Sequence, residues 1–200
     1  SYIYAANGQK LATQTGSSLT YYRNVMVYSR YGDSAEQLLY MLHPEGLVAK
    51  EGAAWVYKYF KTDYLGNTRA LLAVRNGSLV NEGQNTDYYP YGGAHALSNL
   101  QLNKYLFAGK EYQDATVGGN VLGLYDFGAR FYHPLHGRWF NLDPVQKFVN
   151  PYFYCLNNPL SFIDPDGRDV WEIDVNGKII NYKNFAVSKP GYSTLYSIRP

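Results

Sequence analysis

The sequence predicts an all-β fold, and three observations lead to this prediction. Tyrosine occurs 22 times in 200 residues, alongside 9 Phe and 3 Trp, and aromatic side chains favour half-buried strands. Asn-Gly pairs and similar turn residues recur between stretches rich in Val, Tyr, Thr and Leu, as at the tips of hairpins. Few windows show apolar residues at helical spacing. We therefore expect less than about 15% helix, against a usual third.

Composition and charge exclude several classes of protein. The aromatic content of 17% excludes intrinsic disorder, and 19 Gly are too few for a collagen-like chain. The 18 basic and 16 acidic residues give a net charge of +2, so no global charge attracts nucleic acid or an anionic membrane. The longest apolar runs, such as residues 38–42, are far shorter than the roughly 20 residues that span a bilayer.

Residues 1–95 read as a series of short hairpins. Turn residues separate the strand-like stretches at irregular intervals, at positions 7–8, 44–46, 66–67 and 76–77. We expect the N-terminal strand of this series to leave an open sheet edge, which is a template for association, so the isolated chain should oligomerise or aggregate. The many tyrosines fit packing within such a sheet, and ligand stacking is the alternative.

Two further segments follow. Residues 96–168 are turn-rich, with Pro, Asn, Asp and Gly interleaved among aromatic residues. Residues 169–200 are polar, with a hairpin-like stretch at 173–180, and are too short for an independent core. The single cysteine, Cys155, makes no internal disulfide and is expected to be a small buried hydrophobe.

Several motifs in a fixed order resemble the RHS repeat-associated core domain, of the RHS/YD-repeat family. Residues 123–134 read GLYDFGARFYHP, followed by GRW at 137–139 and LDP at 142–144. Further along, the chain has PYFYCLNNP at 151–159 and DPDG at 164–167. Upstream, YKYFKTDYLGNTR at 57–69 and YYPYG at 88–92 are similar to the family's remaining motifs, with Asn67 where Ser is usual.

The resemblance implies an architecture and a role. Residues 1–95 would be YD/RHS-repeat strands of a β-sheet that spirals into a hollow shell, 96–168 the core domain that plugs one end, and 169–200 the start of a truncated variable segment. The implied function is to encapsulate a C-terminal effector of a bacterial polymorphic toxin, secreted or on the cell surface. Its partners would be that effector and the preceding shell strands. The alternative is a carbohydrate-binding or adhesion module of a secreted surface protein.

The resemblance also implies self-cleavage by an aspartic-type mechanism. The corresponding residues here are Asp143, Asp164 and Arg130. Two carboxylates close together do not both ionise readily, so one accepts a proton from water while the other donates one to a carbonyl oxygen. Arg130 would hold a carboxylate through its planar guanidinium. Only 13 positions separate Arg130 from Asp143, with turn residues between them, so the two are expected at neighbouring strands.

The expected cut lies between Arg168 and Asp169. Family junctions commonly read Asp-Pro-x-Gly-Leu with scission after the Leu, whereas Arg168 stands at that position here. A long cation in place of an apolar side chain slows the cut or abolishes it, and both outcomes stay open at this point. Asp-Pro-Asp-Gly is also an ordinary turn sequence, so a purely structural role for Asp164 is the competing interpretation.

We expect no metal or cofactor. The four histidines lack metal-ligand spacing with cysteine or carboxylates, and His133 and His136 are interpreted as loop residues. No phosphate-binding glycine loop and no G-x-S-x-G serine motif is present in the sequence. The chain begins at Ser1 without a leader, and we expect it to be part of a longer protein.

Overall fold

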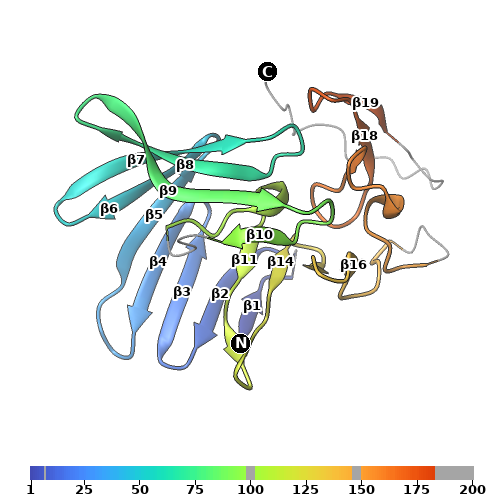
Figure 1. Ribbon diagram of the computed structural model, residues 1–200. Coiled ribbons are helices and arrows are strands. Elements are labelled where there is room, and N and C mark those ends of the chain that lie inside the picture. The colour runs from blue at the N-terminus through green and yellow to red at the C-terminus, as the bar shows by residue number, and fades with distance from the viewer. Residues whose placement is uncertain (7, 98–101, 146–149, 183–200) are drawn as a thin grey trace.

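The computed structural model describes residues 1–6, 8–97, 102–145 and 150–182. These residues are 52% strand and 4% helix, which confirms the predicted all-β fold. A broad curved sheet forms one side of the molecule, and several small sheets and loops from the second half of the chain pack against it (Figure 1). No helix in the described ranges is long and apolar enough to cross a membrane.

The broad sheet has ten antiparallel strands in strictly consecutive order. Each strand therefore pairs with the strands directly before and after it in the chain. The strands are β1 (Tyr2–Tyr4), β2 (Lys10–Thr15), β3 (Ser18–Arg23), β4 (Met26–Tyr31), β5 (Gln37–His43), β6 (Gly46–Glu51), β7 (Ala54–Thr62), β8 (Thr68–Arg75), β9 (Ser78–Tyr88) and β10 (Ala94–Leu97).

Turns join these strands, and several of them contain residues with positive φ angles. Asn76 and Gly77 have φ angles of 51° and 77° and join β8 to β9 as a two-residue loop, as the sequence predicts. The predicted turn at 44–46 joins β5 to β6, and Gly46 has a second role there. A Cβ atom on Gly46 would lie 2.0 Å from the backbone oxygen of Lys58, so only glycine fits against β7. Asn7 lies outside the described residues.

The second half of the chain forms three small antiparallel sheets, ordered β11-β14-β15-β16, β12-β13 and β17-β18-β19. Of two short 3-10 turns, η1 (Phe107–Gly109) precedes β11 and η2 (Cys155–Asn157) lies between β16 and β17. The strands are β11 (Glu111–Gln113), β12 (Thr116–Val117), β13 (Asn120–Val121), β14 (Leu124–Asp126), β15 (Phe131–His133), β16 (Arg138–Trp139), β17 (Phe162–Ile163), β18 (Trp171–Ile173) and β19 (Ile179–Tyr182). We call the region from η1 to β17 the core region.

A cluster of aromatic rings fills the core region. Phe107 lies at its centre and contacts Tyr125, Tyr132 and Tyr154, with ring centroids 5.7 to 6.0 Å apart. Trp139 packs against Tyr132 and Tyr154 from the other side, at 5.6 and 5.3 Å. All five side chains are almost completely buried. The abundant Tyr and Phe of this segment thus supply the packing that a chain with few buried Leu and Ile requires.

Charged groups join the core region to the first hairpin of the broad sheet. The ammonium of Lys10 on β2 lies 2.8 Å from Glu111 and 3.2 Å from Asp126, and all three side chains are largely buried. Tyr22 donates a 2.7 Å hydrogen bond to Glu111, and Tyr4 donates one of 3.1 Å to Asp126. Burial and the neighbouring carboxylates raise the pKa of both tyrosines, which keeps them protonated donors.

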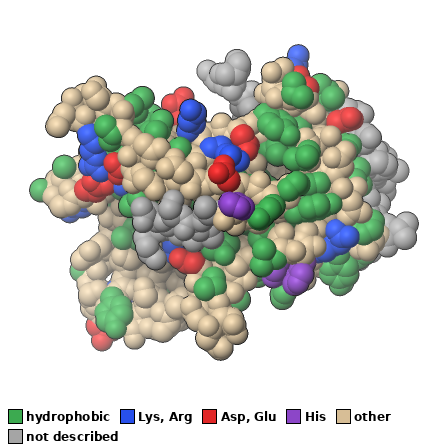
Figure 2. All heavy atoms as spheres, viewed as in Figure 1, with side chains coloured by type: hydrophobic (Ala, Val, Ile, Leu, Met, Phe, Trp, Pro, Cys, Tyr) green, Lys and Arg blue, Asp and Glu red, His purple; other side chains and the backbone are tan. Residues whose placement is uncertain are grey.

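A second charged group crosses strands β6 to β9. The buried ammonium of Lys58 lies 2.7 Å from Glu51 and 3.3 Å from Glu82, while Arg75 contacts the same two carboxylates. Hydrogen bonds from Arg75 and Lys58 lower the pKa of Glu51 to about 2. Figure 2 shows acidic and basic side chains together over this end of the sheet, whereas hydrophobic side chains gather over the core region. The network fixes the register of four successive strands.

Candidate functional site

Arg130 is the centre of the candidate site, and the turn between β14 and β15 positions it. Gly128 has a φ angle of 91°, and its N–H is accepted by Asp126, so the chain reverses within four residues. The Phe127 N–H donates to the carbonyl of Arg130 and closes this turn. Arg130 itself is buried, with its side chain directed into the core region.

The structure brings together the three residues that the sequence named. Arg130 Nη1 lies 3.5 Å from Asp143 Oδ2, and Arg130 Nη2 lies 3.3 Å from Asp164 Oδ2. Both carboxylates are essentially inaccessible to solvent. Arg130 directly precedes β15 and Asp143 follows β16, the neighbouring strand, whereas Asp164 follows β17. The catalytic role of the trio stays a prediction.

Each of the three guanidinium nitrogens has a partner. Besides the two carboxylates, Nε donates a 2.6 Å hydrogen bond to the carbonyl of Gly167, and Nη1 donates one of 3.2 Å to Pro151. The guanidinium carbon, Cζ, lies over the Trp139 ring, 4.0 Å from the ring centroid. Sequence reasoning did not assign these three contacts, because they join segments that the sequence separates by up to 37 positions.

Asp164 forms the predicted turn and the ion pair at once. Its Oδ1 accepts hydrogen bonds from the backbone N–H groups of Gly167 at 2.8 Å and Arg168 at 3.1 Å. Its Oδ2 faces Arg130. The peptide group between Gly167 and Arg168 is therefore held at both ends, its oxygen by Arg130 and its nitrogen by Asp164. The expected cut lies one peptide bond further along the chain.

The electrostatics of the trio favour one extra proton. Burial raises the pKa of Asp164 to about 7, against the opposing effects of Arg130 and of the backbone hydrogen bonds. Burial also lowers the pKa of Arg130, although both carboxylates counteract this. One guanidinium between two carboxylates carries a net charge of −1, and a proton on one carboxyl makes the buried group neutral. The site therefore holds one acid, Asp164, that is protonatable near neutral pH.

The two carboxylate oxygens of Asp143 differ in their hydrogen bonds. Its Oδ1 accepts the N–H of Val145 at 2.8 Å. Its Oδ2 is buried and has no hydrogen-bond partner among the described residues, although it lies 3.5 Å from Arg130. A buried carboxylate oxygen without a donor is costly to maintain, so such an oxygen is a feature of sites where a proton or a water molecule is handled.

The other polar residues singled out from the sequence do not form a site. His133 and His136 stack on each other at 4.1 Å, and burial followed by the nearby His136 lowers the pKa of His133. No group of three potential metal ligands occurs within the described part of the chain. Cys155 is buried, as expected, and burial raises the pKa of its thiol well above the usual value. Arg168 is 46% exposed and lies 4.0 Å from Asp166.

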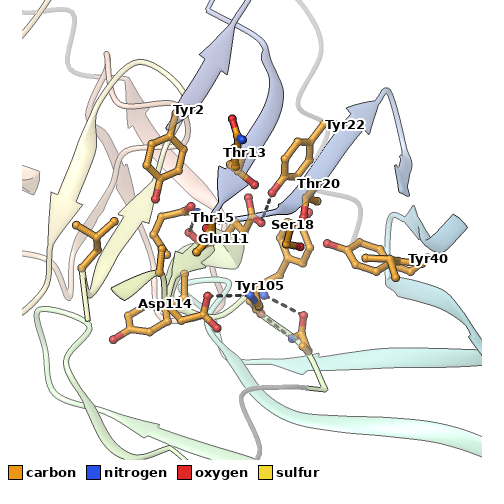
Figure 3. Close-up of a pocket in the computed structure, with 18 of the residues that line it drawn as sticks. Tyr2, Thr13, Thr15, Ser18, Thr20, Tyr22, Tyr40, Tyr105, Glu111 and Asp114 are labelled. Carbon is orange, nitrogen blue, oxygen red and sulfur yellow. Dashed lines mark hydrogen bonds and ion pairs between the residues drawn. The ribbon is translucent and has the colours of Figure 1, made fainter. Parts of the chain in front are cut away.

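A pocket of about 860 Å³ lies between the broad sheet and the core region, away from the trio. Figure 3 shows tyrosine rings from several strands around this space, together with the hydroxyl side chains of β2 and β3. The residues it labels are Tyr2, Thr13, Thr15, Ser18, Thr20, Tyr22, Tyr40, Tyr105, Glu111 and Asp114. Burial raises the pKa of Tyr40 to about 12. The lining is thus neutral and rich in hydroxyl groups, since its carboxylates are already paired with lysines.

A consecutive antiparallel sheet closed by an aromatic core region, with a buried Arg–Asp–Asp trio, defines an RHS-type shell fold. The crystal structure of TcdB2-TccC3-Cdc42 shares this fold, with a TM-score of 0.60 at 22% identity over 84% of this chain and 9% of that one. No family model matches the chain. The sequence relatives and the fold together confirm the resemblance to RHS-repeat proteins drawn from the motifs.

The sequence relatives are much longer proteins. Toxin subunit YenC1 of Yersinia entomophaga is 28% identical over 172 residues, which cover 82% of this chain and 16% of that protein. Salivary gland surface protein 1 of Aedes aegypti is 34% identical over 119 residues, which cover 56% of this chain and 3% of that protein. The chain thus spans less than a fifth of each of these relatives.

Proposed function

We propose that this chain is the closing end of an RHS shell and that its core region cuts the chain once, between Arg168 and Asp169. The observation that carries the proposal is the buried trio. Arg130 lies between Asp143 and Asp164, and Asp164 also binds the backbone just before the expected cut. The effector downstream of the cut and the shell strands that precede this chain are its proposed partners, and the toxin-related relatives support the proposal of an extracellular location.

The proposed chemistry is hydrolysis of one peptide bond. Asp143, whose Oδ2 has no hydrogen-bond donor, takes a proton from a water molecule as the water oxygen bonds to the carbonyl carbon of Arg168. Asp164, which burial keeps protonatable, donates a proton to the developing oxyanion. The C–N bond then breaks as the nitrogen of Asp169 takes the proton held by Asp143, and the former carbonyl oxygen returns its proton to Asp164. Arg168 ends in a carboxyl group, which loses its remaining proton to solvent. Tethering of the bond beside the trio replaces a substrate-binding pocket.

Intact-mass measurement of the 200-residue chain during incubation tests the proposal. We expect two products, 1–168 and 169–200, and no cut in Asp143→Asn or Asp164→Asn. Asp166→Asn is the matched control, because Asp166 belongs to the same turn and does not contact Arg130. Cutting that persists in both Asn variants would leave the two aspartates as turn formers. A product ending at Gly167 would instead assign the cut to the peptide group that Arg130 holds.

Arg168 provides a second, independent arm of this test. Its side chain is exposed, whereas the family junction has an apolar residue at this position. We expect Arg168→Leu to accelerate the cut and Arg168→Lys to leave its rate unchanged. Equal rates in all three chains would show that the junction side chain has no influence on the reaction.

Carbohydrate binding is the second candidate function, and the hydroxyl-rich pocket favours it. Tyrosine faces stack on sugar rings, and threonine and serine hydroxyls form hydrogen bonds with neutral polyols. A glycan array with the folded chain is the test, with Thr20→Val as the variant and Thr62→Val, at an exposed position of β7 outside the pocket, as the control. Binding that Thr20→Val does not weaken would place the glycan elsewhere, and no binding would leave the tyrosines as packing residues.

A further inference from the structure

The segment that follows the proposed cut is built into the fold rather than extending from it. Strand β18 pairs with β17, which precedes the cut, through Phe162 opposite Glu172 and Ile163 opposite Trp171. Strand β19 then pairs with β18 and completes a three-stranded sheet, at the upper right of Figure 1. The cut therefore falls in the connection between two hydrogen-bonded strands.

Buried side chains at the start of the hairpin anchor the segment. Val170 is buried in the aromatic cluster of the core region, together with Phe162. Ile173 is also buried, and its N–H donates a 2.9 Å hydrogen bond to the carbonyl of Ser161. Two apolar side chains and a strand pairing thus lie within five residues of the new chain end that the cut would create.

The turn of the hairpin makes a separate contact with the broad sheet. Gly177, at the tip between β18 and β19, lies so close to the β7–β8 loop that a Cβ atom on it would be 2.6 Å from the oxygen of Tyr64. Tyr64 in turn donates a 3.1 Å hydrogen bond to Leu160, just before β17. The hairpin therefore contacts β17 along its first strand and the β7–β8 loop of the broad sheet at its tip.

We infer that residues 170–182 are a retention hairpin, which keeps the cut chain non-covalently bound to the core region through β17. The inference deepens the proposed function, because it concerns the fate of the segment after the cut. A single nick would then not release what lies downstream. Release would also require removal of β18 from β17 and extraction of Val170 and Ile173 from their buried positions.

An added protease tests this inference without self-cleavage. A recognition sequence for a site-specific protease is inserted between Arg168 and Asp169 in the full chain, and a denaturing gel verifies cutting. We expect the C-terminal piece to elute with residues 1–168 in native size-exclusion chromatography and to separate in guanidinium. Separation under native conditions would overturn the inference, whereas failure of the uninserted chain to cut itself would refute only the proposed function.

Matched variants locate the anchor. Val170→Asp with Ile173→Asp should increase the released fraction at least tenfold, while Val175→Asp, at a position 83% exposed in the same hairpin, should leave it unchanged. Hydrogen exchange on the cut, unmutated protein is a measurement that does not depend on how the variants fold. The Ile173 amide should stay protected after cutting, and loss of its protection on cutting alone would contradict retention.

Discussion

Replacement of Asp164 by Asn should change how stability depends on pH. Burial raises the pKa of Asp164 from 3.8 to about 7 in the folded chain. Between these two values the folded state holds a proton that the unfolded state has lost, so stability falls as pH rises. The slope is about 1.4 kcal/mol per pH unit, and the loss between pH 4 and pH 7 is on the order of 4 kcal/mol. Asp164→Asn does not titrate and should lack this loss.

Urea unfolding followed by tryptophan fluorescence measures this effect, because Trp139 is buried beside Arg130. The quantity of interest is the difference in unfolding free energy between wild type and Asp164→Asn at pH 4.5, 5.5, 6.5 and 7.5. Groups common to both chains cancel in that difference. Asp33→Asn, at an exposed position between β4 and β5, is the control and should retain the wild-type slope. Parallel pH curves for wild type and Asp164→Asn would refute a raised pKa and, with it, the role of Asp164 as proton donor.

Three further substitutions test the packing and the charges. Phe107→Ala should lower the free energy of unfolding by about 3–5 kcal/mol, whereas Phe140→Ala, 63% exposed, should change it by less than about 0.5 kcal/mol in the same urea titration. Gly46→Ala forces a contact with β7 and should cost about 1–3 kcal/mol by thermal unfolding, while Gly93→Ala meets only ordinary contacts and serves as its control. Lys10→Met leaves two buried carboxylates without a cation and should cost about 3 kcal/mol, a loss that high salt does not mask; an unchanged midpoint would show that these carboxylates are protonated.

The fold was predictable because its signals are local. A pair such as Asn76-Gly77 specifies a hairpin through the backbone preferences of two residues, whatever the rest of the chain does. Asn67 shows the limit of such reasoning. The sequence indicates a turn there, but the structure buries Asn67, whose side chain accepts the N–H of Ala108 and joins the β7–β8 loop to η1. That contact depends on how two distant segments meet.

The candidate site was predictable only in part, for a related reason. The order of the family motifs identified Arg130, Asp143 and Asp164, whereas Asp-Pro-Asp-Gly by itself indicates no more than a turn. The stacking of Trp139 on the guanidinium has no counterpart in sequence spacing, because the face that a ring presents is set by tertiary packing. The burial that raises the pKa of Asp164 is likewise a property of the assembled core region.

The consecutive order of the ten strands has a consequence for how the broad sheet folds and how it evolves. Each strand forms hydrogen bonds only with the strands before and after it in the chain. The broad sheet is therefore a linear array, and its stability is approximately the sum of the contributions of neighbouring strand pairs. Such an array assembles progressively, since every new hairpin finds its partner already formed. The duplication or loss of a hairpin would lengthen or shorten the sheet without rethreading the remaining strands.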